Sequence, residues 1–257
     1  MMPTALALSP HLDDAAFSCG GTLAALSDTG WRVVIATMFT ASVPDPGGFA
    51  LACQLDKGLG PEVDYMALRR AEDARAAAIL GAEALWLPFP EAPHRGYHSA
   101  PALFAPPLAA DRVEEALAPA FRELFDGLAP DLILAPQAVG GHVDHVAAVR
   151  ALRRVDPPAP VLWWRDYPYV ARAATPPEPF GEAFAALDEI VVPLGPDALT
   201  RRCRASLAYA SQIGFQFGGA ESAASAFARS GAAETFRSAS GRAVLGGLVT
   251  AREAQRA

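Results

Sequence analysis

Apolar residues are concentrated in short blocks along this chain, and polar residues separate the blocks. Six apolar runs of strand length occur, at residues 4–8, 32–39, 84–87, 131–136, 161–164 and 187–192. Most of these runs lack the alternation of apolar and polar residues that marks a strand with one solvent face. They therefore predict strands that are covered on both faces of a sheet.

Longer segments with helical spacing lie between these runs. In 111–127 apolar residues recur every three or four positions, which predicts a helix with one face toward the core. Further helices are expected at 15–29, 64–80, 146–154 and 196–212. Strands that alternate with helices predict the α/β class. We expect a Rossmann-like, doubly wound, mostly parallel sheet with helices on both faces and the strand order 3-2-1-4-5.

Two segments interrupt this alternation. Residues 42–61 are rich in glycine and proline and predict a long loop, which we place at the mouth of a ligand site. Residues 88–107 contain six prolines and predict irregular structure; His94 and His98 in it could rim a pocket or be solvated. We find no internal repeat and no linker, so residues 1–257 are expected to form a single domain.

Composition narrows the class of protein further. The chain has 257 residues, 52% of them hydrophobic, and a net charge of −7 without a basic run, so nucleic acid is not an expected partner. Cys19, Cys53 and Cys203 are widely spaced, which predicts reduced thiols and a cytoplasmic location. No signal peptide is evident, and no apolar run approaches the ~20 residues of a membrane span. A homo-oligomer is left open.

The first candidate for chemistry directly follows the first apolar run. Pro10-His11-Leu12-Asp13-Asp14 stands where that strand ends and a helix of small residues begins. His11 and Asp14 are three residues apart across a turn, so both could bind one metal ion, and histidine and aspartate are ligands of zinc. Asp13 would then be a spare carboxylate beside the metal. The alternative is that Asp13 or Asp14 only caps the helix.

The same arrangement occurs a second time. The run 131–136 is followed by Gly141-His142-Val143-Asp144-His145 and then by a predicted helix. Three of the five histidines of the chain therefore lie at these two turns. In a doubly wound sheet the two strands are neighbours, and ligands bind at the carboxyl ends of such strands. We therefore expect the two turns to form one site.

These two motifs resemble the signatures of the PIG-L/LmbE-like zinc-dependent N-deacetylases. Residues 10–14 are similar to the family's Pro/Ala-His-Pro-Asp-Asp-Glu motif, and residues 141–145 to its His-x-Asp-His motif. Leu12 replaces the usual proline and Ala15 the usual glutamate. The resemblance implies one Zn²⁺ on the metal ligands His11, Asp14 and His145. It also implies catalytic roles for three residues. Asp13 would be the general base, and Asp144 would orient an imidazole. His142, near the metal but not on it, would stabilise the oxyanion or protonate the leaving amine.

The resemblance also implies the reaction and the substrate. We expect a hydrolase that removes an N-acetyl or other N-acyl group from an amino sugar such as N-acetylglucosamine, or from a related glycoside. Zinc would polarise the acyl carbonyl and activate water, although other divalent transition metals suit such a site. Two alternatives remain: a zinc amidase acting on a thiol conjugate or a natural-product amide, and a non-catalytic binding protein on the same fold, which Ala15 motivates.

Three further residues are candidates for substrate binding. Arg69 begins an Arg-x-x-Glu pattern that is similar to one in the family, whose arginine touches the substrate; the alternative is a surface ion pair between Arg69 and Glu72. Tyr167 and Tyr169 follow the fifth predicted strand and could stack on a sugar ring or pack under the loop. Cys19 is expected to be a buried hydrophobic residue rather than a nucleophile.

Overall fold

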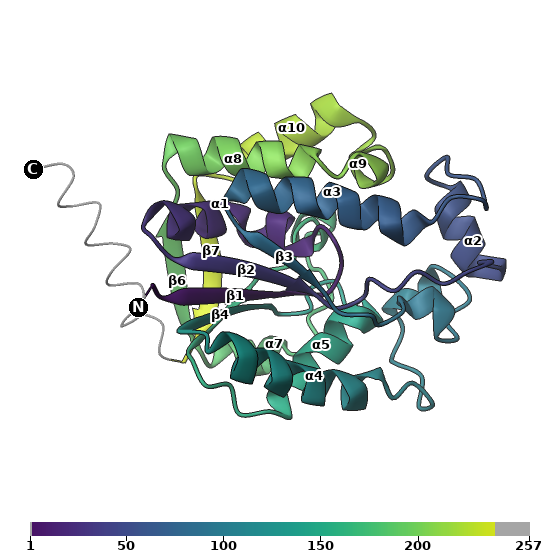
Figure 1. The fold of residues 1–257 in the computed structure, drawn as a ribbon, viewed down its shortest axis with the longest axis horizontal. Helices are drawn as coiled ribbons and strands as arrows, with labels where there is room; N and C mark the ends of the chain where they lie inside the picture. Colours follow the sequence, from purple (N-terminus) through teal and green to yellow (C-terminus); the bar gives the residue numbers. More distant parts are fainter. Residues whose placement is uncertain (1, 240–257) are drawn as a thin grey trace, which may run out of the picture.

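Seven strands form one sheet in the order β3-β2-β1-β4-β5-β7-β6 in the computed structural model, which describes residues 2–239 (Figure 1). The strands are β1 (Thr4–Ser9), β2 (Arg32–Thr37), β3 (Glu83–Trp86), β4 (Leu132–Pro136), β5 (Val161–Trp164), β6 (Asp188–Pro193) and β7 (Ala233–Ser238). The first five strands pair in parallel. This confirms the predicted order 3-2-1-4-5 and the predicted fold class.

The edge strand β6 corresponds to the strand expected at 187–192, but its neighbour β7 was not predicted. β7 lies between β5 and β6 and is antiparallel to both. In β7 every second residue is buried, which is the pattern of a strand with only one covered face. Its six residues include Glu234 and Arg237, so they form no apolar run of the kind that marks the other strands.

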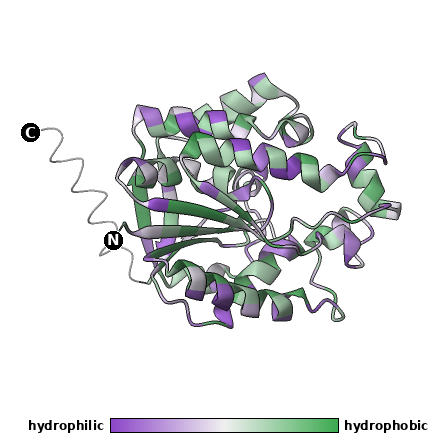
Figure 2. Cartoon of the chain, in the orientation of Figure 1, coloured by the Kyte–Doolittle hydropathy of each residue, from purple (hydrophilic) through white to green (hydrophobic). Residues whose placement is uncertain are grey.

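Successive side chains of the central strands point to opposite faces, and each face is buried under helices. In β1, Ala5 and Ala7 belong to one hydrophobic cluster, whereas Leu6 and Leu8 belong to the other. Figure 2 shows hydrophobic colour along the strands in the middle of the molecule. The uninterrupted apolar runs of the sequence are therefore explained by burial on both faces.

The helices divide between the two faces, as Figure 1 shows. One layer contains α1 (Asp14–Asp28), α3 (Tyr65–Leu80), α8 (Pro196–Leu207), α9 (Ala210–Phe217) and α10 (Ala220–Arg229). The other contains α4 (Val113–Leu128), α5 (Val143–Arg153) and the short α7 (Gly181–Ala185). Two further short helices, α2 (Gly48–Leu55) and α6 (Tyr169–Arg172), and the 3₁₀ turns Ala92–His94 and Pro101–Phe104 lie in the connections.

Two predicted elements need correction. The segment 42–61 is not wholly irregular, because it contains α2. The single helix expected at 196–212 is two helices, α8 and α9, with a break at Tyr209. The hydroxyl of Tyr209 donates to Asp73 of α3 at 2.7 Å, and this buried hydrogen bond fixes the residue at which the chain leaves the helical path.

The first helix is kinked at Cys19, whose φ of −139° is not helical. After the kink the N–H groups of Gly21 and Thr22 donate to the carboxylate of Glu234, at 2.9 and 2.7 Å. A Cβ atom on Gly21 would lie 2.4 Å from Leu194, so only glycine fits here without movement. Cys19 is completely buried, as expected of a small hydrophobic residue.

The described part of the chain contains no helix long and apolar enough to cross a lipid bilayer. All seven strands belong to one sheet. The expectation of a single domain over 1–257 includes residues 240–257, which lie outside the described residues, and it stays a prediction.

Candidate active site

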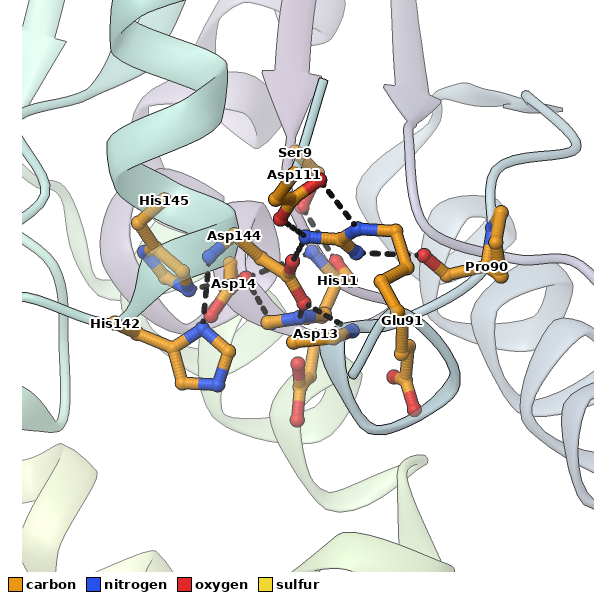
Figure 3. Close-up of polar contacts among 12 residues, drawn as sticks. Ser9, His11, Asp13, Asp14, Pro90, Glu91, Asp111, His142, Asp144 and His145 are labelled. Atoms are coloured by element: carbon orange, nitrogen blue, oxygen red, sulfur yellow. Dashed lines mark hydrogen bonds and ion pairs between the residues drawn. The ribbon is translucent and has the colours of Figure 1, made fainter. Parts of the chain in front are cut away.

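The two motifs meet at the carboxyl ends of β1 and β4, which are paired in parallel. His11 comes from the turn between β1 and α1, and His142 and His145 come from the start of α5 (Figure 3). Ser9, the last residue of β1, holds the first turn: its hydroxyl donates to the carbonyl of His11 at 2.7 Å and accepts the N–H of Ala15 at 3.1 Å. The turn is therefore held in place without a glutamate at position 15.

The three histidines surround one point. One ring nitrogen from each lies within 4.8 Å of the others, and all three residues are buried. Oδ2 of Asp14 lies 3.2 Å from Nδ1 of His11 and 3.2 Å from Nε2 of His145. Nε2 of His145 is buried and, apart from this approach to Asp14, has no hydrogen-bond partner among the described residues. Two nitrogens and a carboxylate directed at one centre fit a divalent metal ion such as zinc.

Two of the imidazoles are held from behind by carboxylates. Nε2 of His11 lies 2.9 Å from Oδ2 of Asp144, and Nδ1 of His145 lies 2.6 Å from Oδ1 of Asp166. A carboxylate only accepts, so these ring nitrogens carry hydrogen; in the neutral form of each ring, which is the form that binds a metal, the lone pairs are on Nδ1 of His11 and Nε2 of His145. Both lone pairs are on the nitrogens that face Asp14. This is the arrangement that metal-binding histidines usually have in proteins.

These carboxylates also favour positive charge at the centre. Burial opposes the charged imidazole, but Asp14 and Asp144 raise the pKa of His11 well above its usual value. In the same way Asp14 and Asp166 overcome burial and raise the pKa of His145 to about 9. Anions that raise the proton affinity of two imidazoles also favour a bound cation. The charge of the site and its geometry therefore both fit a metal ion.

His142 differs from the other two histidines. Its Nδ1 accepts the N–H of Asp144 at 3.2 Å, so the side chain caps α5. Burial lowers the pKa of His142 to about 3, although Asp144 opposes the shift. The neutral ring with its Nδ1 lone pair in use carries its hydrogen on Nε2. His142 thus offers a hydrogen-bond donor rather than a lone pair.

The carboxylates of Asp13 and Asp14 are not simple helix caps. Asp13 occupies the N-cap position of α1, but its side chain makes no capping hydrogen bond. Its Oδ1 lies 3.4 Å from Nη2 of Arg69, and its Oδ2 accepts from Nε2 of Gln216 at 3.0 Å. Asp14 turns back and accepts the N–H of His11 at 2.8 Å. The capping alternative is therefore wrong, because both carboxylates contact other residues of the site instead of capping the helix.

The two neighbouring aspartates have different acidities. Burial raises the pKa of Asp13 to about 6, with Arg69 opposing the shift and Asp14 adding to it. For Asp14, burial is outweighed by His145 and His11, which lower its pKa well below the usual range. Asp14 therefore remains an anion between two imidazoles, whereas Asp13 can take up and release a proton near neutral pH.

Arg69 and Glu72 do not form the surface ion pair that was the alternative for them. Both are buried, and each contacts a different segment of the chain. Arg69 pairs with Glu91 at 2.6 Å and lies beside Asp13. Glu72 accepts from the N–H and the hydroxyl of Ser211 in α9, at 2.8 and 2.6 Å. The two charged residues of the Arg-x-x-Glu pattern thus connect α3 to different parts of the molecule, and Arg69 points into the site.

A cavity of about 250 Å³ is lined by several of these site residues, namely His11, Asp13, Asp14, Arg69 and His142. Tyr169 lines it, and its ring lies 5.4 Å from that of His145. Tyr167 does not line it; its ring stacks on Phe217 at 6.3 Å, as the packing alternative had it. The mouth includes Phe49, Cys53, Asp56 and Lys57 from the segment 42–61, which confirms the placement of that segment.

The sequence did not reveal several residues of the site. Asp166 follows β5, the neighbour of β4, so the rule that polar residues follow strand ends could have found it. Arg95 gave no such signal. Its Nη2 donates to Asp144 at 2.7 Å and to Asp111 at 3.0 Å, which neutralises the carboxylate behind His11. His98, in the same segment, is exposed, as expected of a solvated histidine.

Comparison with known sequences finds one family and one relative that bear on this site. Residues 6–155 match the model of the PIG-L family, described as GlcNAc-PI de-N-acetylase. The chain is 38% identical over 170 residues to 2′-N-acetylparomamine deacetylase of Streptomyces fradiae. The aligned region covers 65% of this chain and 58% of that relative.

Comparison with solved structures finds similar folds over almost the whole chain. A deacetylase of the teicoplanin biosynthetic pathway, solved as a deacetylase–bog complex, superposes with a TM-score of 0.77 at 25% identity and covers 91% of this chain and 97% of its own. The deacetylase of the A40926 pseudoaglycone superposes with a TM-score of 0.74 at 28% identity and covers 91% and 96%.

Proposed function

This chain belongs to the PIG-L family, whose model matches more than half of it, and on that premise we propose that it is a metal-dependent hydrolase that removes an N-acetyl or other N-acyl group from an amino sugar. One observation carries the proposal. His11, Asp14 and His145 converge at one buried centre, and His11 and Asp14 line a cavity that also holds Asp13, a carboxylate whose pKa burial raises to about 6, and the neutral donor His142.

The proposed metal ligands are His11, Asp14 and His145, with one Zn²⁺ per chain. His142 is also close enough to be a ligand, but its Nδ1 lone pair is engaged by the N–H of Asp144, which supports leaving it out. Three protein ligands leave a position open, as catalytic zinc sites require. Zinc bound there would polarise the acyl carbonyl and lower the pKa of a water molecule.

Asp13 and His142 provide the proton transfer and the charge stabilisation. Asp13 takes a proton from the attacking water as the tetrahedral intermediate forms. His142 donates from Nε2 to the oxygen that becomes negative in that intermediate. The C–N bond then breaks, and Asp13 returns its proton to the nitrogen that leaves. The products are the free amine and the carboxylic acid, which then releases its proton to solvent, so no further acid is needed.

Other residues set the positions of these groups. Asp144 and Asp166 orient the imidazoles of His11 and His145, as the sequence analysis expected of Asp144. Arg69 lies in the cavity beside Asp13 and is proposed to contact the substrate. Tyr169 lines the same cavity, with its ring 5.4 Å from that of His145, and is proposed to contact a sugar ring. Tyr167 is not proposed as a contact.

The proposed substrate is an N-acetylated amino sugar or glycoside. Its support is the similarity to 2′-N-acetylparomamine deacetylase and to the deacetylase of the A40926 pseudoaglycone. The aromatic rings of Phe104 and Phe215 are exposed at the mouth of the cavity, which suits a substrate with an apolar part beyond the sugar. Ala15 is buried in the core beside Ser9, so its presence does not favour a non-catalytic protein.

Metal analysis combined with a substrate panel tests the proposal. We expect about one zinc per chain and release of acetate from at least one N-acetyl amino sugar or glycoside, with loss of both after chelation and recovery on adding zinc. Hydrolysis of thiol-conjugate or simple natural-product amides, with no action on N-acetyl sugars, would favour the amidase alternative. A folded protein that neither binds zinc nor releases acetate would contradict the proposal.

A further inference from the structure

Asp13 receives a hydrogen bond from a distant part of the chain. Nε2 of Gln216 donates to Oδ2 of Asp13 at 3.0 Å, across 203 residues of sequence. Gln216 lies in the last turn of α9 and lines the cavity. Gln216 lies outside residues 6–155, which match the family, so this partner of Asp13 comes from the part of the chain that the family model does not cover.

The amide of Gln216 can adopt only one orientation. Its Oε1 accepts from Nη2 of Arg172 at 3.2 Å, while its Nε2 donates to Asp13. Arginine only donates and a carboxylate only accepts. A flipped amide would therefore place its NH₂ group against the guanidinium of Arg172 and its oxygen against the carboxylate of Asp13. Arg172 is itself placed over the ring of Tyr169, 4.9 Å from its centre.

Helix α9 is anchored to the helix that carries Arg69. Glu72 of α3 accepts from the N–H and the hydroxyl of Ser211, and Gln212 donates to the hydroxyl of Tyr65 at 2.9 Å. The N-terminal turn of α9 is therefore fixed to α3, one turn along from Arg69. The cationic and the amide partner of Asp13 are both positioned by α3.

We propose that Gln216, held in orientation by Arg172, is a positioning residue for Asp13. This inference rests on the proposed function. Rotation about the Cβ–Cγ bond sets the plane of an aspartate carboxylate, and partners on both oxygens restrict that rotation. Arg69 lies beside Oδ1, and Gln216 fixes Oδ2, so together they set the plane in which Asp13 meets the water. Misplacing a catalytic group by ~1 Å can cost ~100-fold in rate.

Replacing Gln216 tests the role. Gln216→Met keeps the length of the side chain and removes the donor; we expect kcat to fall by ~10- to ~100-fold while KM and zinc content stay near wild type. Gln216→Asn, too short to reach Asp13, should lose as much. Arg172→Met should show a smaller loss in the same direction. Arg229→Met, which removes an exposed arginine of α10, is the matched control and should keep wild-type kcat.

Combining the substitution with Asp13→Ala separates positioning from a structural effect. If Gln216 acts through Asp13, Gln216→Met should cause no further loss of kcat in the Asp13→Ala enzyme. Wild-type kcat in both Gln216 variants, an additive loss in the double variant, or a rise in KM alone would each overturn the inference and leave the proposed function intact. A wild-type enzyme that is inactive on the whole panel would overturn the proposed function and this role with it.

Discussion

Replacing Asp166 by asparagine tests whether the carboxylate behind His145 sets the affinity of the proposed metal site. Both oxygens of Asp166 are in use: Oδ1 contacts Nδ1 of His145 at 2.6 Å, and Oδ2 accepts the N–H of Val139 at 2.9 Å. Asparagine has one oxygen and one NH₂ group. It can satisfy only one of these two donors, and it must turn its own donor toward the other.

Either orientation of the asparagine weakens the site. If its NH₂ faces His145, the imidazole must accept at Nδ1 and carry its hydrogen on Nε2, the nitrogen proposed to bind zinc. If its oxygen faces His145, the NH₂ opposes the N–H of Val139 and the negative charge behind the imidazole is lost. Loss of such a supporting group typically weakens metal binding by ~10- to ~100-fold. We expect a loss in this range, equivalent to about 1.4 to 2.8 kcal/mol.

Zinc affinity is measured by competition with a chelator of known affinity, with the unfolding transition of each variant as a check on folding. Asp73→Asn is the matched control: Asp73 is buried and accepts two hydrogen bonds, from Trp86 and Tyr209, but it does not line the cavity. Asp73→Asn should bind zinc like the wild type. An Asp166→Asn protein that is folded and binds zinc with wild-type affinity would refute the assignment.

Four further results are expected. Asp13→Ala should keep its zinc and lose roughly 10²- to 10⁴-fold in kcat, since it removes the proposed general base. Because burial raises the pKa of Asp13 to about 6 and a base must be ionised, wild-type kcat should fall as the pH drops through that value, and the Asp13→Ala residual rate should not. His145→Ala should lose its zinc, whereas His142→Ala should keep it and lose roughly 10²- to 10³-fold in kcat; the reverse pattern of zinc retention would exchange their roles. Gly21→Ala should lower the free energy of unfolding by about 1 to 3 kcal/mol in denaturant titrations, because its Cβ would meet Leu194 at 2.4 Å.

The parts of the fold that could be predicted are those whose signal lies within one segment. The interior of β1 and the whole of β4 are apolar because both faces are covered, and each strand is followed within a few residues by a motif with histidine and aspartate. Parallel pairing then brings the two motifs together without further information. β7 could not be predicted in this way. Half of its residues are exposed or partly exposed, and its place between β5 and β6 depends on pairing that the chain order does not specify.

The residues of the candidate site that could be predicted are likewise those that belong to a local motif. His11, Asp14 and His145 were named from their spacing and their resemblance to a family, and they converge in space. Arg95 and Gln216 were missed because each contributes a single contact through tertiary structure, from segments with no local pattern. Tyr167 was named because it follows a strand beside Tyr169, but the hydrophobic core takes up its ring.

The contacts of Asp13 suggest how a shared chemistry can coexist with a substrate preference particular to this chain. The proposed metal ligands, Asp13 and Arg69 all lie within residues 6–155, the part that matches the family. Tyr169, Arg172 and three residues of α9 come from the remainder and line the same cavity; those of α9 are Gln212, Phe215 and Gln216. Because α9 is anchored to α3 through Glu72, a change at the mouth can alter the substrate without moving the metal centre. Substitutions in α9 that leave Gln216 in place should therefore change KM between glycosides while zinc affinity stays constant.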